Sequence, residues 1–302
     1  MLCSDAEAGD AQGDAYIVVR MTPGMVDRPA DLPDYERPPL VEVVLSVQFA
    51  ELQGYRTVHA GLLWEDKFRK AYPIVAEQPP LDPIFEAFGP QVSAPQFQIK
   101  QMSGPQVPRL WFMNTQKTEL VQIQADRFTH NWRKVGEGEN YPRYEALRER
   151  FFSELTELDA FFKSWQIGTI QPNQCEVTYV NRLELRGLDL RAEPGLAVNL
   201  LPRGHLQPDR EGPGLPELED CNLMGRYVLK DADGEPRGRL LVTVQPWPKE
   251  PVLRLDLTVR GAPTSADFEA VADFLDEGRR TIVHGFTAIT TERMHETWGR
   301  VK

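Results

Sequence analysis

Short segments that alternate apolar and polar residues recur along most of the sequence, and this period of two constrains the fold more than any other feature. Such alternation is typical of strands with one buried face and one wetter face. Polar turns separate two pairs of these segments, near 114–118 and at Asp231–Gly234, as in β-hairpins. The predicted strands are Leu40–Phe49, Arg109–Met113, Glu119–Phe128, Cys175–Leu185, Gly225–Lys230, Arg239–Gln245 and Leu253–Arg260. The pattern therefore predicts a mostly antiparallel sheet.

Between these strands, apolar residues recur at steps of three and four, which is typical of amphipathic helices. The longest stripe lies within 141–165 and consists of Tyr144, Leu147, Phe151, Leu155, Leu158 and Phe162. Further helices are predicted at 58–72, after a capping box formed by Thr264 and Asp267, and after Thr290. We therefore predict an α+β fold in which mostly antiparallel sheet packs against long helices, with the option of two related halves.

Residues 1–37 differ in composition from the rest of the chain. Residues 1–36 carry eight acidic side chains against two arginines, several prolines follow, and no apolar period is sustained. We expect a disordered acidic, Pro-rich leader whose deletion leaves stability nearly unchanged. A natural start at Met21 or Met25 is an alternative. Residues 38–302 are predicted to form one domain, whose halves would be 38–186 and 219–302, joined by a Pro- and Gly-rich excursion.

Charge and cysteine content exclude several classes of protein. The formal net charge is −11, which disfavours nonspecific attraction to nucleic acid or anionic lipid. No stretch approaches the ~20 apolar residues that span a bilayer. The three cysteines, Cys3, Cys175 and Cys221, form no C-x-x-C motif, so a disulfide framework is not expected. We predict a cytoplasmic protein that binds neither membrane nor nucleic acid.

The chain contains none of the common nucleotide-binding, hydrolase or zinc-binding sequence motifs. It has no G-x-x-x-x-G-K-[ST] loop, no G-x-G-x-x-G after a strand and no G-x-S-x-G elbow. The five histidines have neither the H-E-x-x-H spacing nor a cysteine partner at zinc-ligand spacing. We therefore assign no catalytic residue and expect no cofactor and no stoichiometric metal.

The polar faces of three predicted strands supply the first group of candidate binding residues. If these strands are neighbours in the sheet, their polar side chains line one face that could bind a polar ligand or a partner. The alternative is an ordinary solvated face of an antiparallel sheet. The residues are Glu42, Ser46 and Gln48, then Gln122, Gln124 and Asp126, then Glu176, Thr178 and Arg182.

A second group follows directly after a predicted strand and contains Arg127, His130, Asn131, Trp132 and Arg133. Cations and an aromatic ring this close together could stack a base or an aromatic ligand. The alternative places Phe128 and Trp132 in the core and pairs the arginines with nearby acids. On that alternative, Trp132 is mostly buried against the helix that begins near Tyr141.

Several short motifs together resemble a sporadically distributed family of bacterial proteins of about this length, whose function is not established. The motifs are Pro38–Val43, Leu120–Gln124 with Phe128, Asn131 and Trp132, Tyr141–Tyr144, Tyr179–Asn181, Phe286, Ile289–Thr290 and Trp298–Gly299. The resemblance covers 37–299. It implies a bacterial, intracellular protein and suits an accessory role such as defence or toxin neutralisation, but it supplies no catalytic residues.

Two main classes of function remain after these exclusions. The first is a non-enzymatic interaction or regulatory protein that binds another protein, since polar strand faces and long loops are plentiful. The alternative is an enzyme or a small-ligand-binding protein with a polar pocket on the curved sheet. An enclosed pocket with titratable groups of perturbed pKa would favour the alternative. A shallow, open sheet face would favour the interaction protein. Nucleic-acid binding is a third class, supported only by the 127–134 cluster and by Arg279, Arg280 and His284, which would need to share one surface. The oligomeric state is left open.

Overall fold

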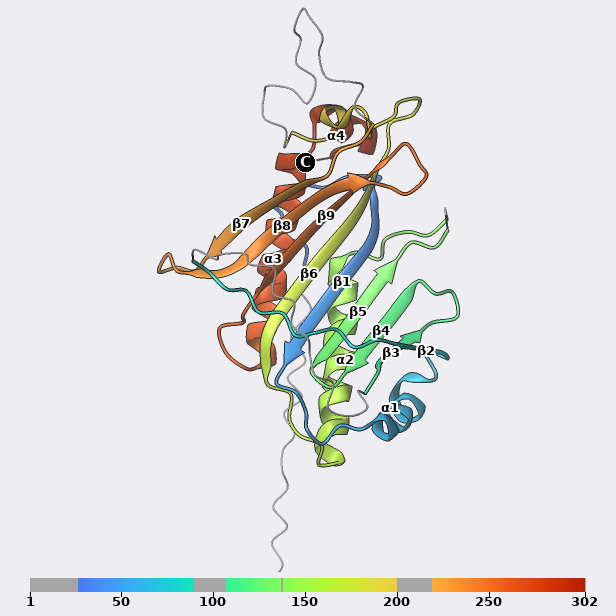
Figure 1. The fold of residues 1–302 in the computed structure, drawn as a ribbon, viewed down its shortest axis with the longest axis vertical. Coiled ribbons are helices and arrows are strands. Elements are labelled where there is room, and N and C mark those ends of the chain that lie inside the picture. The colour runs from blue at the N-terminus through green and yellow to red at the C-terminus, as the bar shows by residue number, and fades with distance from the viewer. Residues whose placement is uncertain (1–26, 90–106, 137, 200–218, 302) are drawn as a thin grey trace, which may run out of the picture.

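A computed structural model describes residues 27–89, 107–136, 138–199 and 219–301, and these form one antiparallel sheet with helices on one side (Figure 1). The sheet has the strand order β2-β3-β4-β5-β1-β6-β9-β8-β7. The strands are β1 Leu40–Phe49, β2 Ile74–Gln78, β3 Arg109–Met113, β4 Glu119–Gln124, β5 Arg127–Arg133, β6 Pro172–Leu183, β7 Leu223–Lys230, β8 Pro236–Pro246 and β9 Leu253–Gly261. The predicted α+β class and mostly antiparallel sheet are confirmed.

Two amphipathic helices cover the same face of this sheet, behind the strands in Figure 1. The helices of the described residues are α1 Thr57–Leu63, continued by a π-helical turn Trp64–Phe68, α2 Tyr144–Ser164, a 3₁₀ turn Pro194–Leu196, α3 Phe268–Ile289 and α4 Glu292–Trp298. Asp276 of α3 accepts hydrogen bonds from Tyr144 and Arg148 of α2, both at 2.8 Å. No helix among the described residues is long and apolar enough to cross a membrane.

The core lies between the sheet and these helices. Each strand contributes every second residue, as its period of two requires, and the predicted stripe of α2 is buried against them. In β1 the inward residues Val43, Leu45, Val47 and Phe49 are at most 1% exposed. The other side of the sheet, which we call the open face, carries Glu42, Ser46 and Gln48 from the same strand.

The strand order places β1 and β6 side by side at the centre of the sheet. The meander β5-β4-β3 continues outward from β1, and β9-β8-β7 continues outward from β6. A helix follows the last strand of each meander, α2 after β5 and α3 after β9. The idea of two related halves fits this order but stays a prediction.

Two strands were not predicted. The segment Glu119–Phe128 was expected to be one strand, but the chain turns at Ala125–Asp126, and Arg127–Arg133 forms β5. Five consecutive residues of β5 are buried. The polar His130 occupies an inward position between Phe128 and Trp132, and this interrupts the apolar–polar alternation that marks a strand. The edge strand β2 is only five residues long and lies next to Pro73 and Pro79.

The cap of α3 also differs from the prediction. Asp267, not Thr264, is the N-cap: its backbone is extended, and its Oδ1 accepts a hydrogen bond from Ala270 N–H at 2.8 Å. Hydrogen bonds from the Ser265 hydroxyl and then from this N–H lower the pKa of Asp267. The carboxylate, rather than the acid, is therefore the form that stabilises the helix.

Removing this cap gives a testable difference. We expect Asp267→Ala to lower the free energy of unfolding by about 1 kcal/mol at neutral pH, whereas Thr264→Ala leaves it unchanged. Because the folded-state pKa of Asp267 is lowered, the stabilisation is present above about pH 4 and is lost as the pH falls below that value. Urea denaturation of both variants at neutral and acidic pH measures this; equal effects of the two substitutions would contradict it.

Residues 27–37 are not a detached leader. Leu32 is fully buried and Tyr35 is 5% exposed, and Tyr35 forms a β-bridge with Arg300 beyond α4. The expectation that the whole of 1–37 is disordered is therefore wrong for 27–37, because two apolar side chains without a period were enough to anchor the segment. Residues 1–26, and 200–218 of the predicted excursion, lie outside the described residues.

Candidate functional site

The open face gathers most of the polar residues that the sequence singled out. Strands β4, β5, β1 and β6 are consecutive neighbours, so the condition set for a shared polar face is met. The pairing register places Gln48 opposite Arg127 on β5 and opposite Gln174 on β6. The predicted residues on this face are Glu42, Ser46, Gln48, Gln122, Gln124, Arg127, Asn131, Arg133, Glu176, Thr178 and Arg182.

A hydrogen-bonded ladder crosses four strands at one end of this face. Gln122 Oε1 accepts from Arg109 at 2.8 Å and from Trp111 Nε1 at 2.9 Å. Gln122 Nε2 donates to Asn131 at 2.7 Å, and Asn131 donates to Glu42 at 2.7 Å. These amides are satisfied within the sheet, which makes this end a fixed surface rather than a ligand pocket.

An extended segment of the chain itself lies across the rest of the open face. Residues 79–89, which we call the strap, leave β2 and pass in front of the central strands toward β8, in teal in Figure 1. The strap has no regular secondary structure. Pro79, Pro80 and Pro83 favour an extended backbone there. The Pro-rich sequence from Pro79 to Pro95 predicts an irregular connection, and residues 79–89 have this conformation, whereas 90–95 lie outside the described residues. The sequence does not predict that the segment lies over the sheet.

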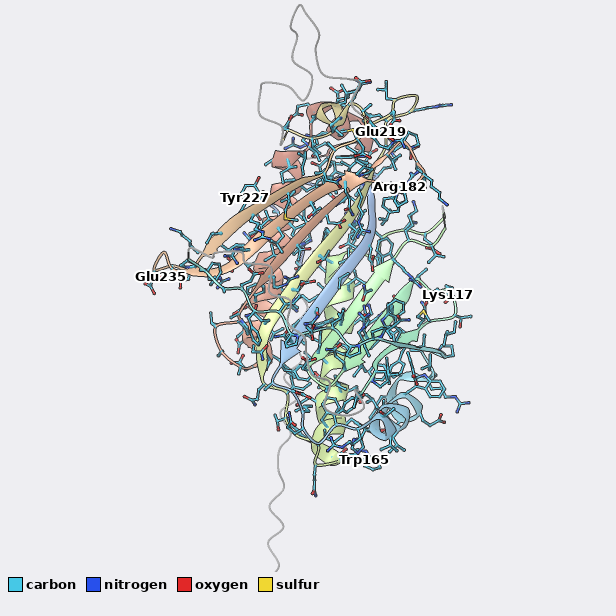
Figure 2. The ribbon with its side chains drawn as sticks, viewed as in Figure 1. Lys117, Trp165, Arg182, Glu219, Tyr227 and Glu235 are labelled. Carbon is cyan, nitrogen blue, oxygen red and sulfur yellow. The ribbon has the colours of Figure 1, made fainter. Side chains whose placement is uncertain are left out.

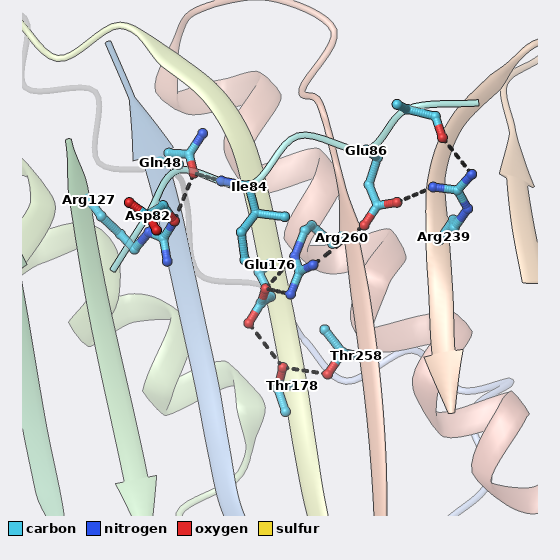
Figure 3. Close-up of polar contacts among 11 residues, drawn as sticks. Gln48, Asp82, Ile84, Glu86, Arg127, Glu176, Thr178, Arg239, Thr258 and Arg260 are labelled. Atoms are coloured by element: carbon cyan, nitrogen blue, oxygen red, sulfur yellow. Dashed lines mark hydrogen bonds and ion pairs between the residues drawn. The ribbon is translucent and has the colours of Figure 1, made fainter. Parts of the chain in front are cut away.

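Side chains of three neighbouring strands bind the backbone of the strap, and Figure 3 shows two of them, Arg127 and Gln48. Gln124 of β4 accepts from Leu81 N–H at 3.0 Å and donates to Leu81 C=O at 2.9 Å. Arg127 of β5 donates to Asp82 C=O at 3.2 Å, and Gln48 of β1 accepts from Ile84 N–H at 2.8 Å. The sheet therefore binds the strap at successive backbone groups.

At the end of the strap nearest β8, the side chains of Glu86 and Phe88 also contact the sheet. The Glu86 carboxylate forms ion pairs with Arg239 of β8 and, at 3.5 Å, with Arg260 of β9. Arg260 is oriented by Glu176, which accepts from its Nε at 2.6 Å. Arg239 also donates to Ala87 C=O at 2.7 Å and stacks on the Phe88 ring at 4.4 Å from its centroid. A carboxylate and an aromatic ring two residues apart are thus recognised by two arginines.

The fit between strap and sheet is incomplete. A hollow with about 250 Å³ of empty space, open to solvent, remains beside Ile84, over Gln48, Arg127 and Gln174. The Oε1 atom of Gln174 is buried and has no hydrogen-bond partner among the described residues. An unsatisfied buried acceptor costs about 1–3 kcal/mol. The strap therefore leaves part of the open face uncovered.

Four of the predicted binding residues lie away from the strap or are engaged elsewhere. His130 points to the helix side, where its Nδ1 lies 2.8 Å from Glu154, and it is 1% exposed. Asp126 lies in the β4–β5 turn and accepts from Gln124 at 2.5 Å. Arg133 donates to Lys117 C=O, and Arg182 pairs with Glu184 and Glu250. The grouping of His130 with its neighbours as one cluster is corrected: in a strand, successive side chains face opposite sides.

The sequence reading missed Arg239, Arg260 and Glu86. Arg239 and Arg260 pair directly across β8 and β9 and face the open side. The signal available was the alternation of β9, in which Arg254, Asp256, Thr258 and Arg260 form its polar face. Nothing local indicates that a segment about 150 residues earlier supplies the opposing carboxylate, since that contact depends on the sheet order.

No group of three or more histidine, cysteine or acidic residues that could hold a metal ion is found within the described ranges. Comparisons with protein-family models, with curated proteins and with solved structures found no match. The open face with its strap is therefore interpreted from its own geometry.

Proposed function

We propose that the protein is a non-enzymatic binding protein whose open face accepts an extended segment of another protein. One observation carries the proposal: the sheet already holds an extended polypeptide there, through the backbone of Leu81, Asp82 and Ile84. Backbone contacts of this kind are available to any extended chain. The Glu86 and Phe88 contacts add a preference for a carboxylate followed by an aromatic residue.

Exposed apolar side chains extend this surface. Leu81, Ile84 and Phe85 on the strap, with Met224 and Val228 on the open side of β7, are five of the 12 exposed large hydrophobic side chains of the described residues. Strand β7 is the edge of the sheet (Figure 2, where Tyr227 is labelled), and edge strands can pair with a partner strand. The basic residues Arg226 and Lys230 on β7 suit an acidic partner segment.

A cytoplasmic location and an accessory role in bacteria, such as defence, complete the proposal. The free thiols Cys175 and Cys221 suit a reducing compartment. The accessory role rests on the resemblance of the sequence motifs alone.

A peptide copy of the strap tests the proposed site directly. In the intact protein the tethered strap has an effective concentration on the order of millimolar and outcompetes an added peptide. The double variant Glu86→Gln, Phe88→Ala weakens the strap but leaves Gln48, Gln124 and both arginines of the sheet unchanged. We expect this variant to bind a fluorescent peptide of residues 79–89 saturably in an anisotropy titration, at least about tenfold more tightly than the unmodified protein does.

Two controls separate recognition from nonspecific binding. A peptide with Gln in place of Glu86 should bind at least about tenfold more weakly, because its charge-assisted hydrogen bonds to arginine are lost. The variant Glu65→Gln removes a carboxylate from an exposed pair with Arg69, 2.6 Å away on another surface, and should gain no peptide binding. A folded strap variant that binds neither peptide, or both equally, would contradict the proposed function.

A further inference from the structure

A second cavity lies on the helix side of the sheet, remote from the strap. The N-terminal segment from Arg28 to Leu40 forms one wall, α3 forms another, and Tyr179 and Asn181 of β6 form the floor. It has about 550 Å³ of empty space, part of it open to solvent. Three parts of the chain that are far apart in sequence therefore enclose this space in part.

The lining of this cavity combines apolar and cationic side chains. Leu40, Ile282, Val283 and Phe286 supply apolar wall, whereas Arg28, Arg143 and Arg279 also line it. Asp34 pairs with Arg143 at 2.9 Å and with Arg28 at 3.4 Å, and Glu145 pairs with Arg279 at 2.7 Å. Three cations against two carboxylates leave a positive excess in a chain of net charge −11, which favours an anionic ligand.

Arg279 is the most enclosed of these cations. Its side chain is 4% exposed, and it stacks on the Tyr144 ring at 4.8 Å. Its one hydrogen bond within the described structure goes to Glu145. Because a guanidinium has five N–H donors, Arg279 has donors left for a second carboxylate.

Two phenols add a further donor. The hydroxyls of Tyr141 and Tyr179 lie 3.2 Å apart, and burial raises the pKa of both, so that both stay protonated. In such a pair one hydroxyl donates to the other, and the accepting phenol keeps its own proton for another acceptor. Tyr141 is held in place by the Trp132 ring, 5.3 Å away between centroids.

We propose that this cavity binds a small carboxylate with an apolar body, its carboxylate held by Arg279 and the Tyr141–Tyr179 pair and its body packed against Ile282, Val283 and Phe286. Arg279 and the Tyr141–Tyr179 pair supply N–H and O–H donors, and a carboxylate supplies the acceptors that these donors require. The apolar wall requires a hydrophobic body beside the carboxylate. This site is independent of the open face and of the proposed function.

Calorimetric titration of the full chain with phenylacetate tests the site, using phenylacetamide and acetate as matched probes. We expect saturable binding of phenylacetate with a dissociation constant on the order of 1 mM or below, as its size allows. Phenylacetamide lacks the charge and should bind at least about tenfold more weakly. Acetate lacks the apolar body and should give no saturable heat.

Variants locate the binding. Val283→Trp fills the cavity and should abolish binding, while Tyr141→Phe removes one hydroxyl and should weaken it several-fold without changing the fold. Tyr227→Phe, on the exposed edge strand, is the matched control and should bind as the unmodified protein does. The absence of phenylacetate binding, equal binding of phenylacetamide, or unchanged binding by a folded Tyr141→Phe variant would overturn the proposal.

Discussion

Replacing Trp132 by alanine is expected to lower the free energy of unfolding by about 3–5 kcal/mol, the usual cost of emptying a large aromatic site in a core. Trp132 is 4% exposed, and it lies opposite Val43 on β1 and Glu119 on β4. Its indole packs on Tyr141, just before α2. The prediction that this side chain is mostly buried is confirmed. Such a loss is a large fraction of the stability of a single domain.

Urea denaturation monitored by circular dichroism measures this loss. Trp165→Ala is the matched control, because Trp165 lies past the end of α2 and is 51% exposed, so the change should stay within about 0.5 kcal/mol. If Trp132→Ala retained its stability but no longer bound the strap peptide, Trp132 would be a recognition residue instead. That outcome would contradict its place on the helix side of the sheet.

Local patterns predicted those elements whose two faces differ. Strand β1 and strand β9 alternate because one side faces the helices and the other faces the open side. The stripe on α2 was predicted for the same reason. In β5 the polar His130 takes an inward position between Phe128 and Trp132, so the alternation is interrupted, and the predicted strand ended at Phe128. The strap has no period either, since its contacts are made by the sheet rather than by its own regular structure.

The candidate site was predictable only in part. The direction of the sheet side chains follows from their positions in the strands, whereas the location of the strap follows from the order of the strands in the sheet. Gln48, Gln124 and Glu176 could be assigned to a shared face from their strand positions, whereas Arg127 could not, because the turn at Ala125–Asp126 was not predicted. Their occupant could not, since the pairing of Glu86 with Arg239 requires the strand order to place β8 near the end of the strap. Local sequence determines which face of the sheet a side chain lies on, whereas the strand order determines which residues it contacts.

Tyr35→Ala is expected to lower the free energy of unfolding by about 3–5 kcal/mol, although Tyr35 lies in the segment that composition assigned to a detached leader. Its ring contacts Phe286, His295 and Trp298 at centroid distances of 5.6, 5.7 and 5.9 Å. Its hydroxyl lies 2.8 Å from that of Thr287. The ring thus joins the N-terminal segment to α3 and α4. Deleting residues 1–36 should consequently destabilise the protein, contrary to the expectation from composition.

Tyr35→Phe separates packing from hydrogen bonding at this position. It keeps the ring contacts and loses only the bond to Thr287, so we expect a cost of about 1 kcal/mol. Thermal and urea denaturation of the full-length variants measure both values. If Tyr35→Ala cost no more than Tyr35→Phe, the ring would contribute nothing beyond its hydroxyl. The N-terminal segment would then rest on the surface without stabilising it, and the cavity wall that it forms beside α3 would be free to open.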